Sequence, residues 1–434
     1  MPVKALYPAG MTQFDVQTDG LQTRYDVQAV RACYPALADG WAYLDGAAGT
    51  QLPRSVIEAE SRAYAEGIGN HGGFFAASRR SDALTAAARQ AVADLVGAPS
   101  ADGVALGPST TALTYRFADG LAKTWREGDE IVLTRLDHDA NVRPWVQAAA
   151  RRGVRVRWAE PEPVTLDLPV EAVTGQLSER TRLVAVTAAS NVVGTRPDLP
   201  AIAAAAPAAG ALVYVDGVHA APHGPVDVVA LGAALFATSA YKWSGPHLAA
   251  VVAADPATFG PIHPDKLDSA TEDVPERFEY GTSPFAQHAG LAAAVDHIAE
   301  LAELSGHADA AGSAGSASRR ERVLGSMAAV EAYETALMAR LLAGLAGLDR
   351  VHRIGSPARH APTVWFTVDG LHPDQVAEHC AKAQVNVWSG HNYAWELAGF
   401  LGIRETGSAV RASLSCYTTD EDVARLLDAL GTLP

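Results

Sequence analysis

The chain has 434 residues, 48% of them hydrophobic, which is enough for a large buried core arranged as two or three structural units. Its 49 acidic and 34 basic residues give a net charge of −15. This balance argues against nucleic acid and anionic membranes as partners, because both select for basic patches.

The cysteines and the apolar runs point to a reducing compartment. Cys33, Cys380 and Cys416 show neither metal-like spacing nor an even disulfide framework. No signal-like apolar region opens the chain, and Gly, Pro or charged residues interrupt the apolar runs well short of a membrane span. We therefore expect a soluble cytoplasmic protein without a metal site.

Composition and periodicity divide the chain into five parts. The first lacks periodicity, and the fourth, SGHADAAGSAGSASRRERV, is small and polar. A long amphipathic pattern then leads into alternating strand and helix patterns. The expected parts are a flexible arm (1–25), an N-terminal segment that packs with the small domain (26–53), a large domain (54–304), a Gly/Ser-rich connection (305–322) and a small C-terminal domain (323–434).

The N-terminal segment predicts a short helix, a strand and a tight turn. Asp26 can cap a helix over VQAVRACYPAL, and WAYLDGAAGTQLP predicts a strand that breaks into a Gly-rich turn. Ala47 lies in this turn and is a candidate for lining a pocket. Any tight turn would also use Gly46 and Gly49, so the turn alone does not show that Ala47 lines a pocket.

A candidate phosphate turn follows two predicted helices. These helices occupy residues 54–97, with a Gly-rich aromatic break before the second begins at about Ser81. The strand GVALG then leads into a turn that opens a helix at Ser109, Thr110 and Thr111. Free N–H groups and the helix dipole suit a phosphate there, although an N-cap residue would give the same letters.

Two more predicted strands end on candidate side chains. IVLT is followed by His138, and TRLVAVT by Asn191. Each has a structural alternative, because a histidine at a strand end can simply be hydrogen-bonded and an asparagine can form an Asx turn.

The stretch 213–247 carries the strongest pattern, since the apolar runs LVYVD and ALFATS end at Asp216 and Ser239, with Lys242 just beyond. Both runs predict buried parallel strands whose carboxyl ends face one crevice. A lysine there loses hydration, which lowers its pKa and makes its amine a nucleophile that can form a Schiff base. The alternative is a helix-capping aspartate and a solvated lysine.

Six ordered motifs over about residues 26–430 resemble the class V aminotransferase and cysteine desulfurase-like superfamily. They are GPSTT, LDHDAN, SNVVGT, DGVHAAP with SAYKWSGPH, RFEYGTSPF and VRASL. The resemblance implies an α/β fold of fold type I, with a mainly parallel seven-stranded sheet in the large domain and a smaller α/β C-terminal domain. It also implies pyridoxal 5′-phosphate (PLP) as cofactor, bound covalently to Lys242.

The same resemblance implies roles for individual residues. Asp216 would hold the pyridinium nitrogen, His138 would stack on the ring and relay protons, and Arg411 would grip a substrate carboxylate. Thr282 would reach the cofactor of a second subunit, which implies a homodimer with shared active sites. The remaining expected contacts are Thr110, Thr111, Ser239 and Tyr241 to the phosphate, Asn191 and His219 to the phenolic oxygen, and Ala47 and Asn392 to the substrate.

One loop departs from the desulfurase pattern. GHNYA places Tyr393 where desulfurases carry a nucleophilic cysteine, and a phenol cannot hold sulfane sulfur. The sequence therefore predicts a carbon–sulfur lyase acting on a cysteine S-conjugate in secondary metabolism, akin to lincosamide-pathway enzymes of antibiotic biosynthesis. Lys242, His138 and Tyr393 would be its catalytic residues. The alternatives are decarboxylative oxidation to an aldehyde, transamination, epimerisation, and cofactor binding without catalysis.

Overall fold

The computed structural model describes residues 25–307 and 317–434. Residues 1–24 of the expected arm and 308–316 of the expected connection lie outside the described residues. Tyr25 is buried and stacks on Tyr333, with ring centroids 4.3 Å apart. The packed chain therefore includes the last residue assigned to the arm.

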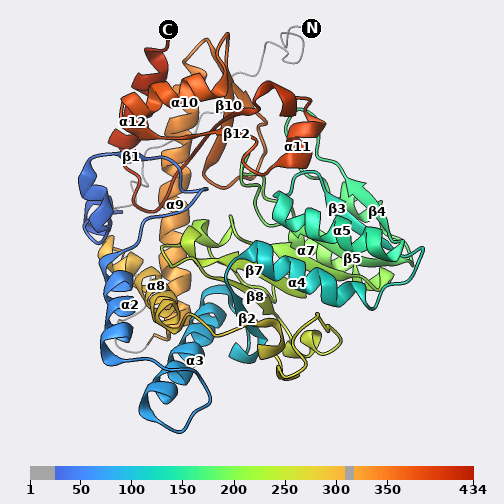
Figure 1. Cartoon of the computed structure of the whole chain (residues 1–434). Helices are drawn as coiled ribbons and strands as arrows, with labels where there is room; N and C mark the ends of the chain where they lie inside the picture. Colours follow the sequence, from blue (N-terminus) through green and yellow to red (C-terminus); the bar gives the residue numbers. More distant parts are fainter. Residues whose placement is uncertain (1–24, 308–316) are drawn as a thin grey trace.

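A seven-stranded sheet forms the centre of the fold (Figure 1). Its strands are β2 Val104–Gly107, β3 Glu130–Thr134, β4 Arg155–Ala159, β5 Thr181–Thr187, β6 Leu212–Asp216, β7 Leu235–Ser239 and β8 Ala249–Ala253. Their order across the sheet is β2-β8-β7-β6-β5-β3-β4. Strand β8 is antiparallel to both its neighbours and the other pairings are parallel, so the mainly parallel sheet is confirmed.

Helices cover both faces of this sheet. The helices between Arg54 and Ala346 are α2 Arg54–Glu66, α3 Ala76–Val96, α4 Thr110–Ala122, α5 Arg143–Arg152, α6 Val170–Thr174, α7 Leu199–Ala205, α8 Phe285–Leu304 and α9 Arg319–Ala346. Along β5, Val184 and Val186 join one hydrophobic cluster with α8 and α9, while Leu183 and Ala185 join another with α4 and α5. Burial on both faces explains why these strands are continuous apolar runs in the sequence.

The C-terminal domain is a smaller α/β unit, as predicted. Its elements are β9 Val351–Ile354, β10 Thr363–Val368, α10 Pro373–Lys382, β11 Val385–Asn386, β12 Trp388–Gly390, α11 Trp395–Phe400, β13 Ala409–Ser413 and α12 Asp420–Gly431. Four of these strands form an antiparallel sheet ordered β12-β13-β10-β9. Strand β1 (Ala42–Tyr43) pairs with β11, which joins the N-terminal segment to this domain.

Two helix starts differ from the sequence prediction. Helix α3 begins at Ala76 rather than near Ser81, because Ser78 and Ser81 are buried and bond to the Gly-rich loop instead of capping the helix. Helix α9 begins at Arg319, so the end of the expected connection is helical, and a capping box of Ser318 and Glu321 sets that start.

A third difference concerns the first helix, α1, which spans only Val27–Arg31. Asp26 caps it as predicted, by accepting a hydrogen bond from the Ala29 N–H at 3.0 Å. The helix stops before Pro35, which begins a separate 3₁₀ turn, because a proline disfavours helical backbone in the residue before it.

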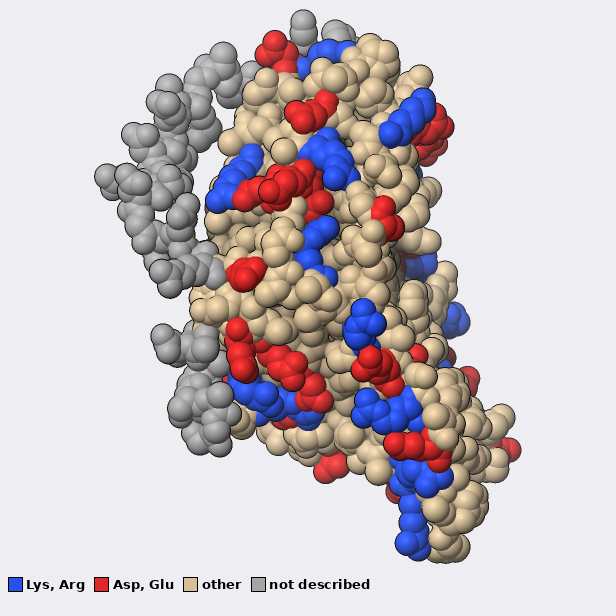
Figure 2. All heavy atoms as spheres, turned by 90° about the vertical axis from the view of Figure 1, so that its left-hand side faces the viewer, with Lys and Arg blue, Asp and Glu red and all other residues tan. Residues whose placement is uncertain are grey.

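Charged side chains of both signs are interspersed on the surface. On the face shown in Figure 2, Lys and Arg lie beside Asp and Glu. Arg319, for example, pairs with Asp94 at 2.7 Å and with Asp296 at 3.1 Å. Within the described ranges, no helix has the length and apolar character needed to cross a membrane.

Candidate active site

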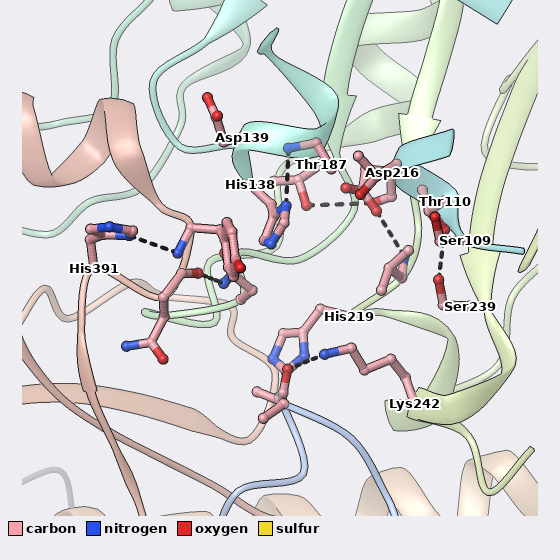
Figure 3. A pocket seen from close by; sticks show the side chains of 18 of the residues that line it. Ser109, Thr110, His138, Asp139, Thr187, Asp216, His219, Ser239, Lys242 and His391 are labelled. Carbon is pink, nitrogen blue, oxygen red and sulfur yellow. Dashed lines mark hydrogen bonds between the residues drawn. The ribbon is translucent and has the colours of Figure 1, made fainter. Parts of the chain in front are cut away.

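The carboxyl ends of β5, β6 and β7 open into a pocket of about 820 Å³ (Figure 3). Open α/β sheets bind ligands at this edge. The N-terminal segment and the C-terminal domain supply the other walls. The predicted site residues that line the pocket are Ala47, Thr110, Thr111, His138, Asn191, Asp216, His219, Ser239, Tyr241, Lys242, Asn392, Tyr393 and Arg411.

Lys242 enters the pocket from a 3₁₀ turn after β7 and is buried. Its Nζ donates a hydrogen bond to the carbonyl oxygen of Ala47. Burial lowers the pKa of Lys242 to about 7, and the charge of Arg411 acts in the same direction. A large share of this amine is therefore uncharged and nucleophilic at neutral pH.

Asp216 is the last residue of β6, and it too is buried. Its Oδ1 accepts a hydrogen bond from the Val218 N–H at 3.0 Å. Burial raises the pKa of Asp216 to about 6, while Lys242 opposes that rise. A carboxylate placed at this depth can hold a protonated ring nitrogen.

The predicted phosphate turn opens α4 as expected. Ser109 caps the helix through the Ala112 N–H, and the hydroxyl groups of Thr110 and Ser239 lie 2.7 Å apart. The hydroxyl pair therefore joins the start of α4 to the end of β7. Free N–H groups, two hydroxyls and the positive end of a 13-residue helix suit an anion.

His138 is a neutral imidazole. Its Nδ1 accepts a hydrogen bond from the Ala140 N–H at 3.1 Å. Burial lowers the pKa of His138 to about 3, and the charges of Lys242 and Arg411 act in the same direction. The ring lies 5.1 Å from that of Tyr393, measured between centroids.

The loop that carries Tyr393 is fastened to the large domain. The Asn191 side chain donates to the Asn392 carbonyl at 2.7 Å, and the Asp139 N–H donates to the Tyr393 carbonyl at 2.8 Å. Asn392 and Tyr393 both have left-handed backbone, with φ of 47° and 60°. The loop therefore holds the phenol beside His138, while 65% of Tyr393 remains exposed.

Arg411 lies within β13 and is buried in the pocket wall. One of its guanidinium nitrogens donates to the Asn191 carbonyl at 3.2 Å. Burial lowers the pKa of Arg411 to about 10, while Asp45 acts in the opposite direction, so the side chain stays charged. A buried cation at the pocket wall suits a carboxylate.

The polar groups that line the pocket fit PLP. Lys242, Asp216 and the start of α4 match the aldehyde, ring nitrogen and phosphate of this cofactor. Three pocket side chains have buried polar atoms without a partner among the described residues: both ring nitrogens of His219, Oδ1 of Asn191 and Nε of Arg411. Buried polar groups are normally paired, so these atoms are available to a ligand.

The structure does not bring Thr282 to this pocket. Thr282 is exposed in the turn before α8 and is absent from the pocket lining. Its predicted contact with the cofactor of a second subunit stays a prediction.

Sequence reasoning missed several pocket residues. Thr187 ends β5 just as Asp216 ends β6, so strand-end position could have found it. Asp137 lies behind the pocket, hydrogen-bonded to Asn141 at 2.7 Å, and burial raises the pKa of Asp137 to about 8. The other lining residues that were not predicted include Tyr115, Arg143, Trp388 and His391.

Comparisons with known proteins agree with the fold and the site. The aminotransferase class-V family profile matches residues 42–314 and 320–426. A Mycobacterium tuberculosis (strain CDC 1551 / Oshkosh) protein described as uncharacterized is 34% identical over 412 residues, which cover 94% of this chain and 99% of that protein. A cysteine desulfurase of Yersinia pestis (strain Pestoides F) is 32% identical over 426 residues, covering 94% and 98%.

A solved structure gives the same result. The cysteine desulfurase of Thermococcus onnurineus NA1 is 27% identical with a TM-score of 0.81, covering 94% of this chain and 97% of that chain. Fold and site define a fold-type I enzyme that uses PLP. The chain belongs to the class V aminotransferase family, within its cysteine desulfurase-like group.

Proposed function

We propose that this chain is a PLP-dependent carbon–sulfur lyase that performs β-elimination on an S-substituted cysteine. With one water molecule consumed, the products would be a thiol, pyruvate and ammonia. The observation that carries the proposal is the loop at the pocket mouth, which presents Tyr393 beside His138. Among the described residues that line the pocket, none is a cysteine. A protein-bound persulfide would therefore lack an acceptor there.

The residues of the sheet edge supply the acid–base chemistry. Bound PLP provides an electron sink for the negative charge that develops at the substrate Cα. Lys242 accepts the Cα proton, because burial gives its amine a pKa of about 7. Asp216 keeps the ring nitrogen protonated, and Thr110, Thr111 and Ser239 hold the phosphate.

The opposite wall orients the substrate. Arg411 binds the α-carboxylate, which fixes the Cα–H bond relative to Lys242. The sulfur substituent extends toward the mouth, where Tyr393 positions the departing sulfur through its hydroxyl. The pocket volume of about 820 Å³ is in the range that takes a cofactor together with a substituted amino acid.

A second copy of the chain completes the site in this proposal. Thr282 and the exposed Phe74 and Phe75 lie outside the pocket of their own chain, and Phe74 is 92% exposed. Large exposed aromatic side chains suit an interface between subunits. Light scattering would show a dimer of about 91 kDa, twice the 45.3 kDa chain.

The direct test is a product assay. The PLP-loaded protein is incubated with S-methyl-, S-benzyl- and S-carboxymethylcysteine, and pyruvate, ammonia and thiol are measured. The proposal expects equal amounts of the three products from at least one conjugate, and none with the Lys242→Ala variant. Carbon dioxide release with oxygen consumption, or a requirement for a keto acid, would replace the lyase by the oxidase or the aminotransferase.

A further inference from the structure

Three buried ionisable side chains form a line that leads away from the pocket. His219 lies after β6, His223 ends the following 3₁₀ turn, and Glu334 belongs to α9. The rings of His219 and His223 meet edge to face with centroids 4.9 Å apart. His223 Nδ1 lies 2.8 Å from Glu334 Oε2. The sequence predicts a contact of His219 with the phenolic oxygen of PLP, whereas His223 and Glu334 have no role in the function proposed above.

Each of these three side chains has at least one polar atom without a hydrogen-bond partner among the described residues. In the described part of the chain, no partner is found for either ring nitrogen of His219, for His223 Nε2 or for Glu334 Oε1. A second cavity of about 20 Å³, enough for one water molecule, is lined by His223, Glu334, Lys242 and Ser415 among others. Unpaired buried polar atoms are costly, so a packing role alone does not account for them.

The surroundings of His219 keep its imidazole neutral. Burial, followed by the charges of His223, Lys242, Arg411 and Arg196, lowers the pKa of His219 well below its usual value. A neutral imidazole has one N–H and one lone pair. The nitrogen that carries the hydrogen therefore determines what the ring offers to the pocket. Figure 3 shows the His219 ring near the Lys242 side chain.

Glu334 fixes the hydrogen of His223. An ionised carboxylate only accepts hydrogen bonds, so the hydrogen between the two groups belongs to Nδ1 of His223. Arg196 holds the same residue from its backbone side, by donating to the His223 carbonyl at 2.7 Å. The charge of Glu334 also contributes to raising the pKa of Tyr25, Tyr333 and Cys416.

We propose that His223 and Glu334 are positioning residues that act through His219: Glu334 holds His223, and the His223 ring sets the orientation of the His219 ring beside Lys242. The proposal rests on the function proposed above in taking His219 to lie next to bound PLP. Neither His223 nor Glu334 lines the pocket, so their effect on it must pass through the His219 ring.

The test is a pH titration of the visible absorbance of the PLP-loaded protein without substrate. For Glu334→Gln, which removes the charge but keeps an acceptor, we expect the midpoint to fall by at least about 0.5 pH unit. Glu58→Gln is the control for the same substitution, because Glu58 is exposed on α2 and lies outside the pocket. Its midpoint should move by less than about 0.2 pH unit.

A double variant shows whether the effect passes through His219. In the His219→Gln background, Glu334→Gln should give no further shift. An equal shift in both backgrounds, or none in either, would overturn the proposal. If Glu334→Gln does not fold, His223→Asn replaces it, and its shift must also vanish with His219→Gln. Because no substrate is present, failure of the lyase assay would leave this result unaffected.

Discussion

The two sides of the pocket are built in different ways. On the sheet side, Asp216 and Ser239 end paired strands, so the sheet register fixes them. On the loop side, Tyr393 belongs to a short irregular segment fastened by hydrogen bonds from Asn191 and Asp139. Substituting a side chain whose position is fixed by the sheet disturbs the packed core. A loop residue can be substituted without disturbing that core. We infer that the sheet side carries the chemistry shared by the family and the loop side selects the bond that breaks.

The largest effect is expected on the sheet side, at Lys242. Lys242→Ala should lose covalently bound PLP and at least about 10³-fold in turnover, because no other amine lines the described pocket. Visible absorbance after dialysis and a pyruvate assay would measure both losses. Lys123→Ala, which changes a lysine outside the pocket, is the control and should behave as wild type. Unchanged absorbance in Lys242→Ala would refute the cofactor assignment.

The next largest effect is expected at Asp216. Asp216→Ala should lower turnover by about 10²-fold and weaken PLP retention, because the ring nitrogen loses its acid and becomes a poorer electron sink. Equilibrium dialysis with PLP and kcat on a cysteine conjugate would measure the two effects separately. Full activity of Asp216→Ala would contradict the role given to this strand end.

The pH dependence of PLP attachment follows from the lowered pKa of Lys242, which is about 7. Only the uncharged amine attacks an aldehyde, so the attachment rate to the PLP-free protein should rise with pH and level off above about 7. Below that value it should fall about tenfold per pH unit. Stopped-flow absorbance would record the rate. A rate still rising steeply at pH 9 would mean that burial does not lower this pKa.

The smallest effect is expected on the loop side. Tyr393→Phe should lower turnover about three- to tenfold with little change in PLP binding, because only one hydrogen bond to the departing sulfur is lost. Tyr64→Phe is a matched control, since Tyr64 is 66% exposed and lies outside the pocket. If both variants match wild type, the phenol has no part in the reaction.

The same contrast explains what the sequence could predict. Asp216, Ser239 and Lys242 were found because apolar runs of strand length end beside them. Arg143 and His391 were missed, because they reach the pocket from α5 and from the loop after β12, and no local pattern records such long-range packing.

Helix starts were less predictable than strand ends. The sequence places the start of α3 at about Ser81, but in the folded chain Ser78 and Ser81 are buried on this helix and hold the loop before it. Whether a serine caps a helix or faces the interior depends on tertiary contacts, which the sequence pattern does not contain.

In the proposed reaction the sulfur leaves as a thiol with the substituent and is not transferred to the protein. Mass spectrometry of the PLP-loaded protein during turnover, first with free cysteine and then with S-benzylcysteine, tests it directly. We expect no persulfide on Cys33, Cys380 or Cys416, and continued turnover of the conjugate after these thiols are alkylated. A persulfide on any of the three cysteines during turnover would refute the lyase and assign the chain to the desulfurases.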